Sequence, residues 1–222
     1  MSNQDHSNTT KKSTVYVALI TALAIIIGSV ILGLGGQTTP QEPAPEAAPA
    51  VELPNAGITE SNKASITFTT NQGEIVIETT PAVAPLTVNA IAALAQKNYF
   101  DNTICHRLTT AGIYVLQCGD PTGTGTGGPG FNIPDENLPQ PIDNNYPAGT
   151  VAMANAGPGT SGSQFFLVYQ DTTLGPDYTI WGSVTSGLDI LQTIASAGVV
   201  DGGTDGAPLT GVTIESTKVT IS

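Results

Sequence analysis

The chain has 222 residues and a formal net charge of −12, with six Lys and Arg residues against 18 Asp and Glu residues. This balance excludes the basic surface with which nucleic-acid-binding proteins displace phosphate counterions, and equally a polybasic patch for an anionic membrane. The 25 Gly and 16 Pro residues indicate many turns between short strands. We therefore expect one acidic domain with appended segments.

An uncharged apolar run occupies residues 15–36, which is long enough to cross a hydrocarbon layer of roughly 30 Å as a helix. Lys11 and Lys12 precede it, so the positive-inside tendency predicts a cytoplasmic head at residues 1–14, and everything after the run outside. A cleaved signal peptide is the alternative, because small residues between 36 and 50 offer cleavage sites. The length of the run favours a single-pass anchor in the cell membrane, with the folded domain extracytoplasmic.

Residues 37–62 are rich in Pro, Ala, Glu and Thr. This composition has too little apolar surface to offset the entropy lost on ordering, and its prolines favour extended conformations. We expect a disordered, semi-rigid tether that leads to a folded domain at residues 63–222.

The folded domain opens with two segments, 65–70 and 74–80, that alternate apolar and polar residues around a turn at 71–73. Pro85 suits the first turn of a helix that continues to about residue 95, and a second helix is expected at 188–197, where Gly198 ends it. Short strands and glycine-rich loops lie between the helices, and an alternating stretch closes the chain. This order is consistent with a small antiparallel barrel whose open ends are plugged by helices.

Arg107 is the only arginine of the chain, and it follows His106, the only histidine of the folded domain. A single guanidinium in a chain that otherwise uses lysine indicates a site that needs a planar fork of donors. An ordinary salt bridge is the alternative.

Two long segments carry a family resemblance. NYFDNTICHRLTTAGIYVLQCGDPTGTGTGGPG (98–130) and GTVAMANAGPGTSGSQFFLVYQDTTLGPDYTIWGSV (149–184) are similar, in order and spacing, to the cyclophilin-type peptidyl-prolyl cis-trans isomerases, and the second resembles the bacterial branch. The resemblance extends over about residues 65–222. It implies a mainly β fold, a closed antiparallel barrel of about eight strands capped by two α-helices.

The resemblance also implies the residues of an isomerase site. Arg107 corresponds to the catalytic arginine of the family. The other residues correspond to the proline pocket (Tyr114, Val115, Phe166, Leu174), to the groove that binds the peptide backbone (Gln117, Ala154, Asn155, Gln164), and to the border of the site (His106, Tyr178). Phe165 and Met153 are expected in the barrel core instead.

The reaction that the resemblance implies requires rotation about an X-Pro bond against a barrier of ~18–20 kcal/mol. No bond is made or broken, so we expect no cofactor and no metal site. In the twisted amide the prolyl nitrogen regains a lone pair, to which Arg107 can donate a hydrogen bond that is largely absent in the planar forms. The expected partners are proline-containing segments of exported proteins, whose folding the domain assists, and not nucleic acid; a monomer is expected.

Some features depart from the family pattern. Two additional residues between Arg107 and Gln117 predict a bulged hairpin tip, which makes the placement of Tyr114 dependent on the alignment. Val115 and Thr173 stand where methionine and, in some members, tryptophan occur, so binding of cyclosporin-like peptides stays open.

Two alternatives also stay open. A non-catalytic module that binds proline-containing peptides is the alternative function, and the arginine favours catalysis over it. Cys105 and Cys118 lie on the two arms of the hairpin that the resemblance implies, where they either form a disulfide or remain two buried thiols.

Overall fold

The structure is a computed structural model that describes residues 52–222. The predicted cytoplasmic head, the predicted anchor at 15–36 and most of the predicted tether lie outside the described residues. Within residues 52–222, no helix combines the length and the apolar character that a membrane span requires.

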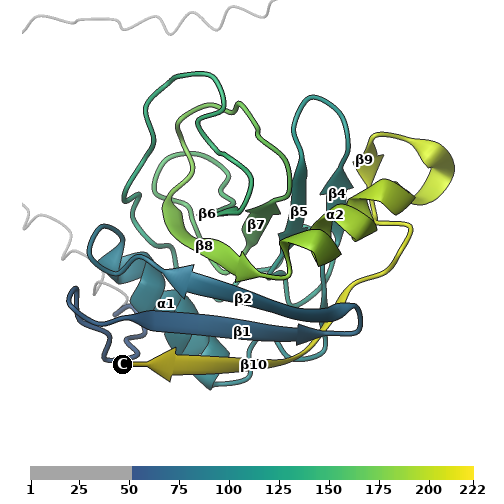
Figure 1. Cartoon of the computed structure of the whole chain (residues 1–222). Coiled ribbons are helices and arrows are strands. Elements are labelled where there is room, and N and C mark those ends of the chain that lie inside the picture. The colour runs from purple at the N-terminus through teal and green to yellow at the C-terminus, as the bar shows by residue number, and fades with distance from the viewer. Residues whose placement is uncertain (1–51) are drawn as a thin grey trace, which may run out of the picture. The chain divides into compact units, whose positions relative to one another are not determined.

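The described part is mainly β, as predicted, with two α-helices. Figure 1 shows the elements, which are β1 (Ala64–Thr70), β2 (Gly73–Thr79), α1 (Pro85–Gln96), β3 (Thr103–Ile104), β4 (Arg107–Thr109), β5 (Val115–Cys118), β6 (Thr150–Met153), β7 (Phe165–Val168), β8 (Ile180–Ser186), α2 (Leu188–Ala197), the 3₁₀ turn η1 (Val200–Gly202), β9 (Asp205–Gly206) and β10 (Thr213–Ile221).

The strands within residues 52–222 form one antiparallel sheet of ten, in the order β3-β10-β1-β2-β8-β6-β7-β5-β4-β9. The sheet is strongly curled, because β3 and β4 are separated by only Cys105 and His106 yet lie near opposite ends of this order. Among the described residues no ladder joins the end strands β3 and β9, so the curled sheet is a half-barrel where a closed barrel was expected. The sheet therefore has ten strands where about eight were expected, and two of the ten, β3 and β9, have only two residues each.

The side chains of β5, β6 and β7 alternate between two hydrophobic clusters. Leu116, Phe165 and Met153 point into the main core, where Trp181 and Ile66 are also fully buried. Their neighbours Val115, Ala152 and Phe166 point to the other face of the sheet and form a second, smaller cluster. Period-two alternation thus gives these strands one core face and one face that is free to build a site.

Each helix packs against one of the longer strands of the sheet. α1 packs next to β10 and α2 next to β2 (Figure 1). Pro85 is the first residue of α1, and the carboxylate of Glu136 accepts hydrogen bonds from the free N–H groups of Leu86 (3.1 Å) and Thr87 (2.8 Å). A negative charge at this end also complements the helix dipole.

The end of the predicted tether packs onto the domain. Ile58 is buried, and Leu53 and Ala56 contact the main core. The Asn89 side chain accepts a hydrogen bond from the N–H of Ile58 (2.9 Å) and donates one to its carbonyl (2.8 Å). Part of the segment that was expected to be a tether therefore packs against the folded domain ahead of residue 63.

Cys105 and Cys118 are joined by a disulfide. It links the residue before His106 to the residue after Gln117, so it ties together the two arms of the β4–β5 hairpin. Both cysteines are buried.

Candidate active site

A small pocket of about 150 Å³ opens on the outer face of β5 and β7, over the second hydrophobic cluster. Its walls are apolar on one side and polar on the other, and it is lined by Arg107, Ile113, Val115, Gln117, Ala154, Asn155, Phe166, Leu174 and Tyr178. Val115 and Phe166 are almost fully buried and form its floor. A concave apolar site with a few convergent polar groups is typical of ligand binding.

Tyr146 supports this pocket from below. Its ring is fully buried and lies near the rings of Phe166 (centroids 6.1 Å apart) and Tyr178 (6.2 Å). Its hydroxyl accepts a hydrogen bond from the N–H of Tyr178 (3.1 Å) and lies 3.2 Å from each of the carbonyl oxygens of Gly175 and Tyr178. Burial raises the pKa of Tyr146 to about 12, so the hydroxyl stays protonated and able to donate.

Arg107 stands at the polar wall with its guanidinium held by two neighbours. Its Nε and Nη2 each donate a 2.7 Å hydrogen bond to the carboxylate of Asp205. Its Nη1 lies 3.4 Å from Oε1 of Gln117, directly across the β4–β5 ladder. The hydrogen bond to Asp205 raises the pKa of Arg107, so the guanidinium is charged.

The side-chain amides of Gln117 and Gln164 extend this hydrogen-bond network along the sheet. Nε2 of Gln117 donates to Oε1 of Gln164 (2.8 Å). Nε2 of Gln164 in turn donates to the carbonyls of Gly125 (3.0 Å) and Gly127 (2.9 Å). Arg107 and the glycine-rich loop are therefore linked through two glutamines.

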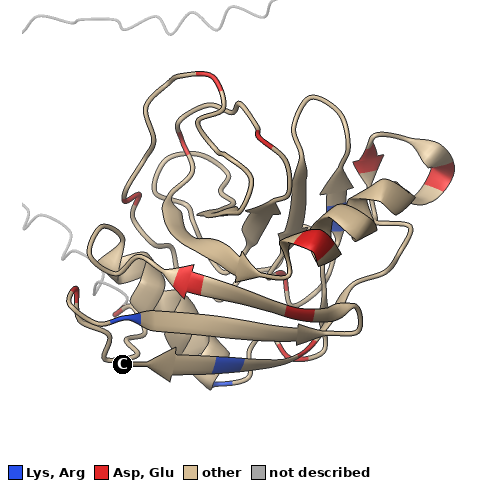
Figure 2. Ribbon diagram, in the orientation of Figure 1, with Lys and Arg blue, Asp and Glu red and all other residues tan. Residues whose placement is uncertain are grey.

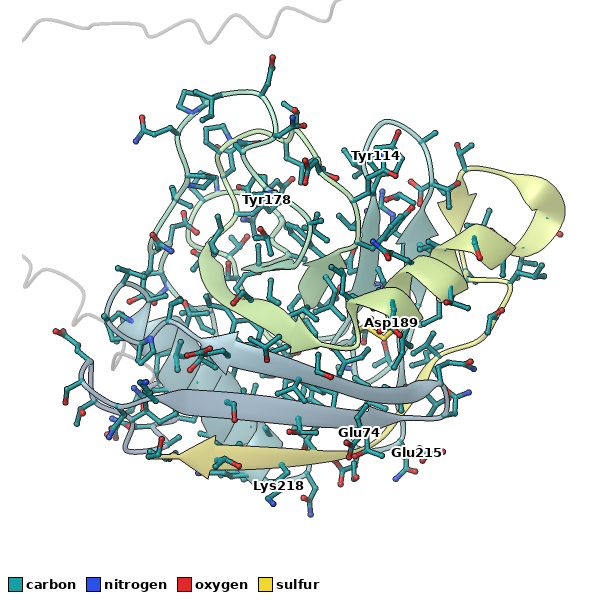
Figure 3. All side chains as sticks on the ribbon, viewed as in Figure 1. Glu74, Tyr114, Tyr178, Asp189, Glu215 and Lys218 are labelled. Carbon is teal, nitrogen blue, oxygen red and sulfur yellow. A yellow bond between two sulfur atoms is a disulfide. The ribbon has the colours of Figure 1, made fainter. Side chains whose placement is uncertain are left out.

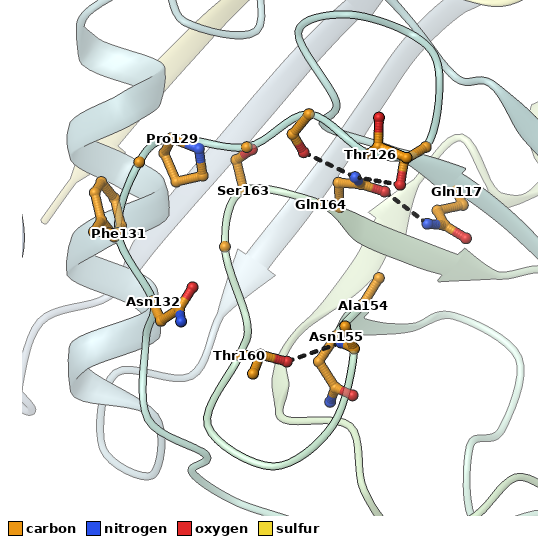
Figure 4. Close-up of a pocket in the computed structure, with 16 residues that line it drawn as sticks. Gln117, Thr126, Pro129, Phe131, Asn132, Ala154, Asn155, Thr160, Ser163 and Gln164 are labelled. Carbon is orange, nitrogen blue, oxygen red and sulfur yellow. Dashed lines mark hydrogen bonds between the residues drawn. The ribbon is translucent and has the colours of Figure 1, made fainter.

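A larger cavity of about 820 Å³ adjoins the pocket and shares Gln117, Ala154 and Asn155 with it. Figure 4 shows this cavity between the glycine-rich loop and the segment that carries Asn155 and Thr160. All of its lining residues are uncharged. Together the two cavities form a groove that is apolar at one end and lined by amides and backbone along its length.

Asp120 holds the glycine-rich loop in place. Its carboxylate accepts hydrogen bonds from the N–H groups of Thr122 (2.7 Å), Gly125 (2.6 Å) and Gly127 (3.0 Å). Burial alone would raise the pKa of Asp120, but these bonds and one from the Thr122 hydroxyl outweigh it and hold the pKa well below its usual value. Gly127 allows the close approach, because a Cβ there would collide with the carboxylate.

Eight of the predicted site residues line the small pocket, namely Arg107, Val115, Gln117, Ala154, Asn155, Phe166, Leu174 and Tyr178. Gln164 lines the adjoining cavity instead. Thr173 lines neither, and its hydroxyl accepts a hydrogen bond from the N–H of Asn144 (2.8 Å).

Tyr114 lies outside the pocket that the resemblance assigned to it. Alternation along the strand points Val115 into the pocket and Tyr114 away from it, toward Tyr169 (ring centroids 6.0 Å apart). Ile113, which forms a β-bridge with Ala111 at the hairpin tip, lines the pocket beside Val115. Figure 3 shows Tyr114 at the β4–β5 hairpin and Tyr178 on the separate loop that leads to β8.

His106 also lies outside both cavities. A Cβ at Gly125 would lie 3.6 Å from its ring, and neither ring nitrogen has a hydrogen-bond partner among residues 52–222. Burial lowers the pKa of His106, against a smaller opposing effect of Asp120, and so favours the neutral ring. Its position is that of a packing residue beneath the glycine-rich loop.

Sequence reasoning missed three residues of this site. Ile113 was hidden by the insertion in the hairpin. Tyr146 is a lone aromatic residue in a polar stretch (Asp143 to Ala148), a weak signal for a buried anchor. Asp205 is 98 residues from Arg107 in the sequence, and no local pattern connects the two.

Comparisons with known proteins agree on one family. The model of the family "Cyclophilin type peptidyl-prolyl cis-trans isomerase/CLD" matches residues 65–219. The chain is 45% identical over 203 residues to a probable peptidyl-prolyl cis-trans isomerase B of Mycobacterium leprae, a match that covers 85% of this chain and 68% of the relative. It is 46% identical over 190 residues to the protein of the same name of Mycobacterium tuberculosis, covering 78% of this chain and 61% of the relative. The chain thus spans less than two thirds of the second relative.

Solved structures that are similar to the chain belong to the same family. A cyclophilin type peptidyl-prolyl cis-trans isomerase of Cryptosporidium parvum is similar with a TM-score of 0.62 and 29% identity, over 71% of this chain and 98% of the other. A structure of the same protein in the presence of the dipeptide Ala-Pro is similar with a TM-score of 0.61 and 30% identity, over 70% of this chain and 98% of the other.

Proposed function

The chain belongs to the cyclophilin-type peptidyl-prolyl cis-trans isomerases, and we propose that its folded domain isomerises X-Pro bonds of exported proteins at the outer face of the cell membrane. The observation that carries the proposal is that a charged guanidinium, that of Arg107, lines the same small apolar pocket as Val115 and Phe166. A proline ring in this pocket would place its nitrogen close to the donors of Arg107.

The reaction then follows from differential binding. The apolar floor holds the ring, and the amides of the groove hold the backbone before it, so one side of the bond can turn while the other stays fixed. As the amide twists, the prolyl nitrogen gains a lone pair, and Arg107 donates to it. The hydrogen bond is stronger in the twisted state than in either planar state, which lowers the barrier. A relative of this chain was solved in the presence of Ala-Pro, which supports a proline-containing ligand.

The cellular setting rests on the sequence. The uncharged run at residues 15–36, with Lys11 and Lys12 before it, supports a single span that leaves the catalytic domain outside. The Pro- and Glu-rich segment after it would hold the domain clear of the membrane. Newly exported chains with X-Pro bonds would then be the clients whose folding the domain assists.

Activity is tested on the full chain with a short X-Pro peptide in a protease-coupled isomerisation assay. Faster conversion of the cis peptide supports the proposal. Binding of the peptide without faster conversion would contradict it and favour a binding module.

Topology is tested on intact cells that lack an outer membrane. The folded domain is expected to be cleaved by added protease and to resist extraction by carbonate. Full-length protein in the soluble cytoplasmic fraction would contradict the anchor, and a shortened form in the medium would show cleavage.

A further inference from the structure

Asp205 reaches the polar wall of the pocket from a distant part of the chain. It lies in β9, where Asp205 pairs with Thr109 and Gly206 with Leu108 of β4. The N–H of Thr110 also donates to the carbonyl of Thr204 (2.8 Å). Because Arg107 and Thr109 are two residues apart on β4, their side chains lie on the same face of the sheet, and β9 delivers the carboxylate to that face.

The contact between the Asp205 carboxylate and the Arg107 guanidinium is a bidentate ion pair. Both carboxylate oxygens accept a bond, one from Nε and one from Nη2, each at 2.7 Å. Such bidentate pairs fix the plane of the guanidinium as well as its position. The third contact, from Nη1 to Gln117, is longer at 3.4 Å and does not fix the plane by itself.

The pair leaves one end of the guanidinium for the pocket. Asp205 occupies the edge formed by Nε and Nη2, so the end formed by Nη1 and the remaining N–H of Nη2 is the part that can face a ligand. The Arg107 side chain is 41% exposed. A long side chain with so much exposure would change rotamers freely without such a partner.

The charges of the pair are stable at neutral pH. The hydrogen bond from Arg107 lowers the pKa of the Asp205 carboxyl, and the same bond raises the pKa of Arg107. Both shifts therefore indicate a carboxylate and a guanidinium that stay ionised together.

We propose that Asp205 is a positioning residue for isomerisation, whose carboxylate fixes the guanidinium of Arg107 so that its free end faces the prolyl nitrogen in the pocket. The inference rests on the proposed function and adds to it a residue that acts only through Arg107. Transition-state donors must be held within about 0.5 Å of their productive position. Gln117 alone holds Arg107 by one long contact, so loss of Asp205 should lower turnover more than peptide binding.

The test compares full-length variants. Asp205→Asn keeps the shape and removes the charge and one acceptor, and Asp205→Glu keeps the charge on a longer side chain. Asp201→Asn is the matched control, because Asp201 is an exposed acid four residues earlier on the same loop. The catalysed exchange rate of a saturating X-Pro peptide and the Kd of that peptide are measured by NMR.

Asp205→Asn is expected to lower the catalysed rate roughly 10- to 100-fold, with Kd within about twofold of the parent. Asp205→Glu should recover part of the loss, and Asp201→Asn should behave as the parent. In an Arg107→Ala background, Asp205→Asn should cause no further loss, whereas a merely structural role would add one. A rate for Asp205→Asn within twofold of the parent, or a further loss in that background, would overturn the proposal.

A second readout does not depend on activity. Because Arg107 is the only arginine of the chain, its Nε–H gives a single NMR signal. The Nε–H is expected to exchange slowly with water in the parent and at least tenfold faster in Asp205→Asn. Equal exchange in the two proteins would overturn the proposal. If the parent catalyses no isomerisation while this difference is observed, the proposed function fails and the positioning of Arg107 stands.

Discussion

Replacement of Tyr146 by Phe tests how the pocket is supported. The change removes one hydroxyl, which accepts from the N–H of Tyr178 and lies within hydrogen-bond distance of two carbonyls. A buried polar group that loses its partner costs about 1–3 kcal/mol. Because Tyr146 itself is fully buried and the ring is retained, packing is nearly unchanged, and this range should be the whole effect on the free energy of unfolding.

Loss of the Tyr146 hydroxyl should weaken peptide binding as well as stability. The hydroxyl ties down the loop that carries Leu174 and Tyr178, two walls of the pocket, so peptide affinity should fall together with stability. The free energy of unfolding is measured by denaturant titration, and Kd by peptide titration. Tyr114→Phe is the control, because it makes the same chemical change outside the pocket at a hydroxyl that has no side-chain hydrogen bond in the described part of the chain.

The same variant should also change how stability depends on pH. The pKa of Tyr146 is raised to about 12 in the folded state. The stabilisation that the protonated hydroxyl gives the folded state is therefore fully present below the unfolded pKa near 10 and is lost as the pH rises through about 12. Tyr146→Phe should therefore lose less stability than the parent over this range. If Tyr146→Phe matches Tyr114→Phe in stability and in alkaline pH dependence, the reasoning about this hydroxyl is refuted.

Two further predictions concern the hairpin that carries Arg107. The pKa of His106 is lowered by burial from 6.5, so its contribution to stability is present above that value and is lost as the pH falls toward the folded pKa. As the pH falls from 7 through the ordinary histidine value of about 6.5 and below it, the unfolding free energy of the parent should fall more steeply than that of His106→Phe, and equal slopes would contradict this. The disulfide between Cys105 and Cys118, which are 13 residues apart, should stabilise the domain by up to ~3 kcal/mol. Thiol counting on denatured protein from its native compartment should find no free thiol before reduction, and two free thiols would rule the bridge out.

The fold could be predicted from the sequence because its signals are local or are carried by long motifs. Alternation at 65–70 and 74–80 corresponds to β1 and β2, and the expected helices correspond to α1 and α2. Phe165 and Met153 lie in the main core, as expected. The family assignment, confirmed by the comparisons, rests on motifs that extend over most of the domain.

The site could be predicted only where the motifs are continuous. Val115 and Phe166 lie in ungapped stretches, and both line the pocket. Tyr114 lies outside the pocket because alternation along the strand points its side chain away from the face that carries Val115, and Ile113 lines the pocket on that face instead. Asp205 could not be found, because its contact with Arg107 depends on the pairing of β9 with β4, two short strands that are far apart in the sequence.

The most direct test of the account is the catalysed rate of Arg107→Ala. At a saturating X-Pro peptide, the rate should fall roughly 10²- to 10³-fold, as for the loss of one preorganised donor to a transition state. Kd and the free energy of unfolding should stay close to those of the parent, because the side chain is partly exposed and acts mainly in the twisted state. Lys218→Ala, which removes an exposed positive charge from β10 (blue on that strand in Figure 2), should behave as the parent. A rate for Arg107→Ala within about twofold of the parent would contradict the central claim that this guanidinium stabilises the twisted amide.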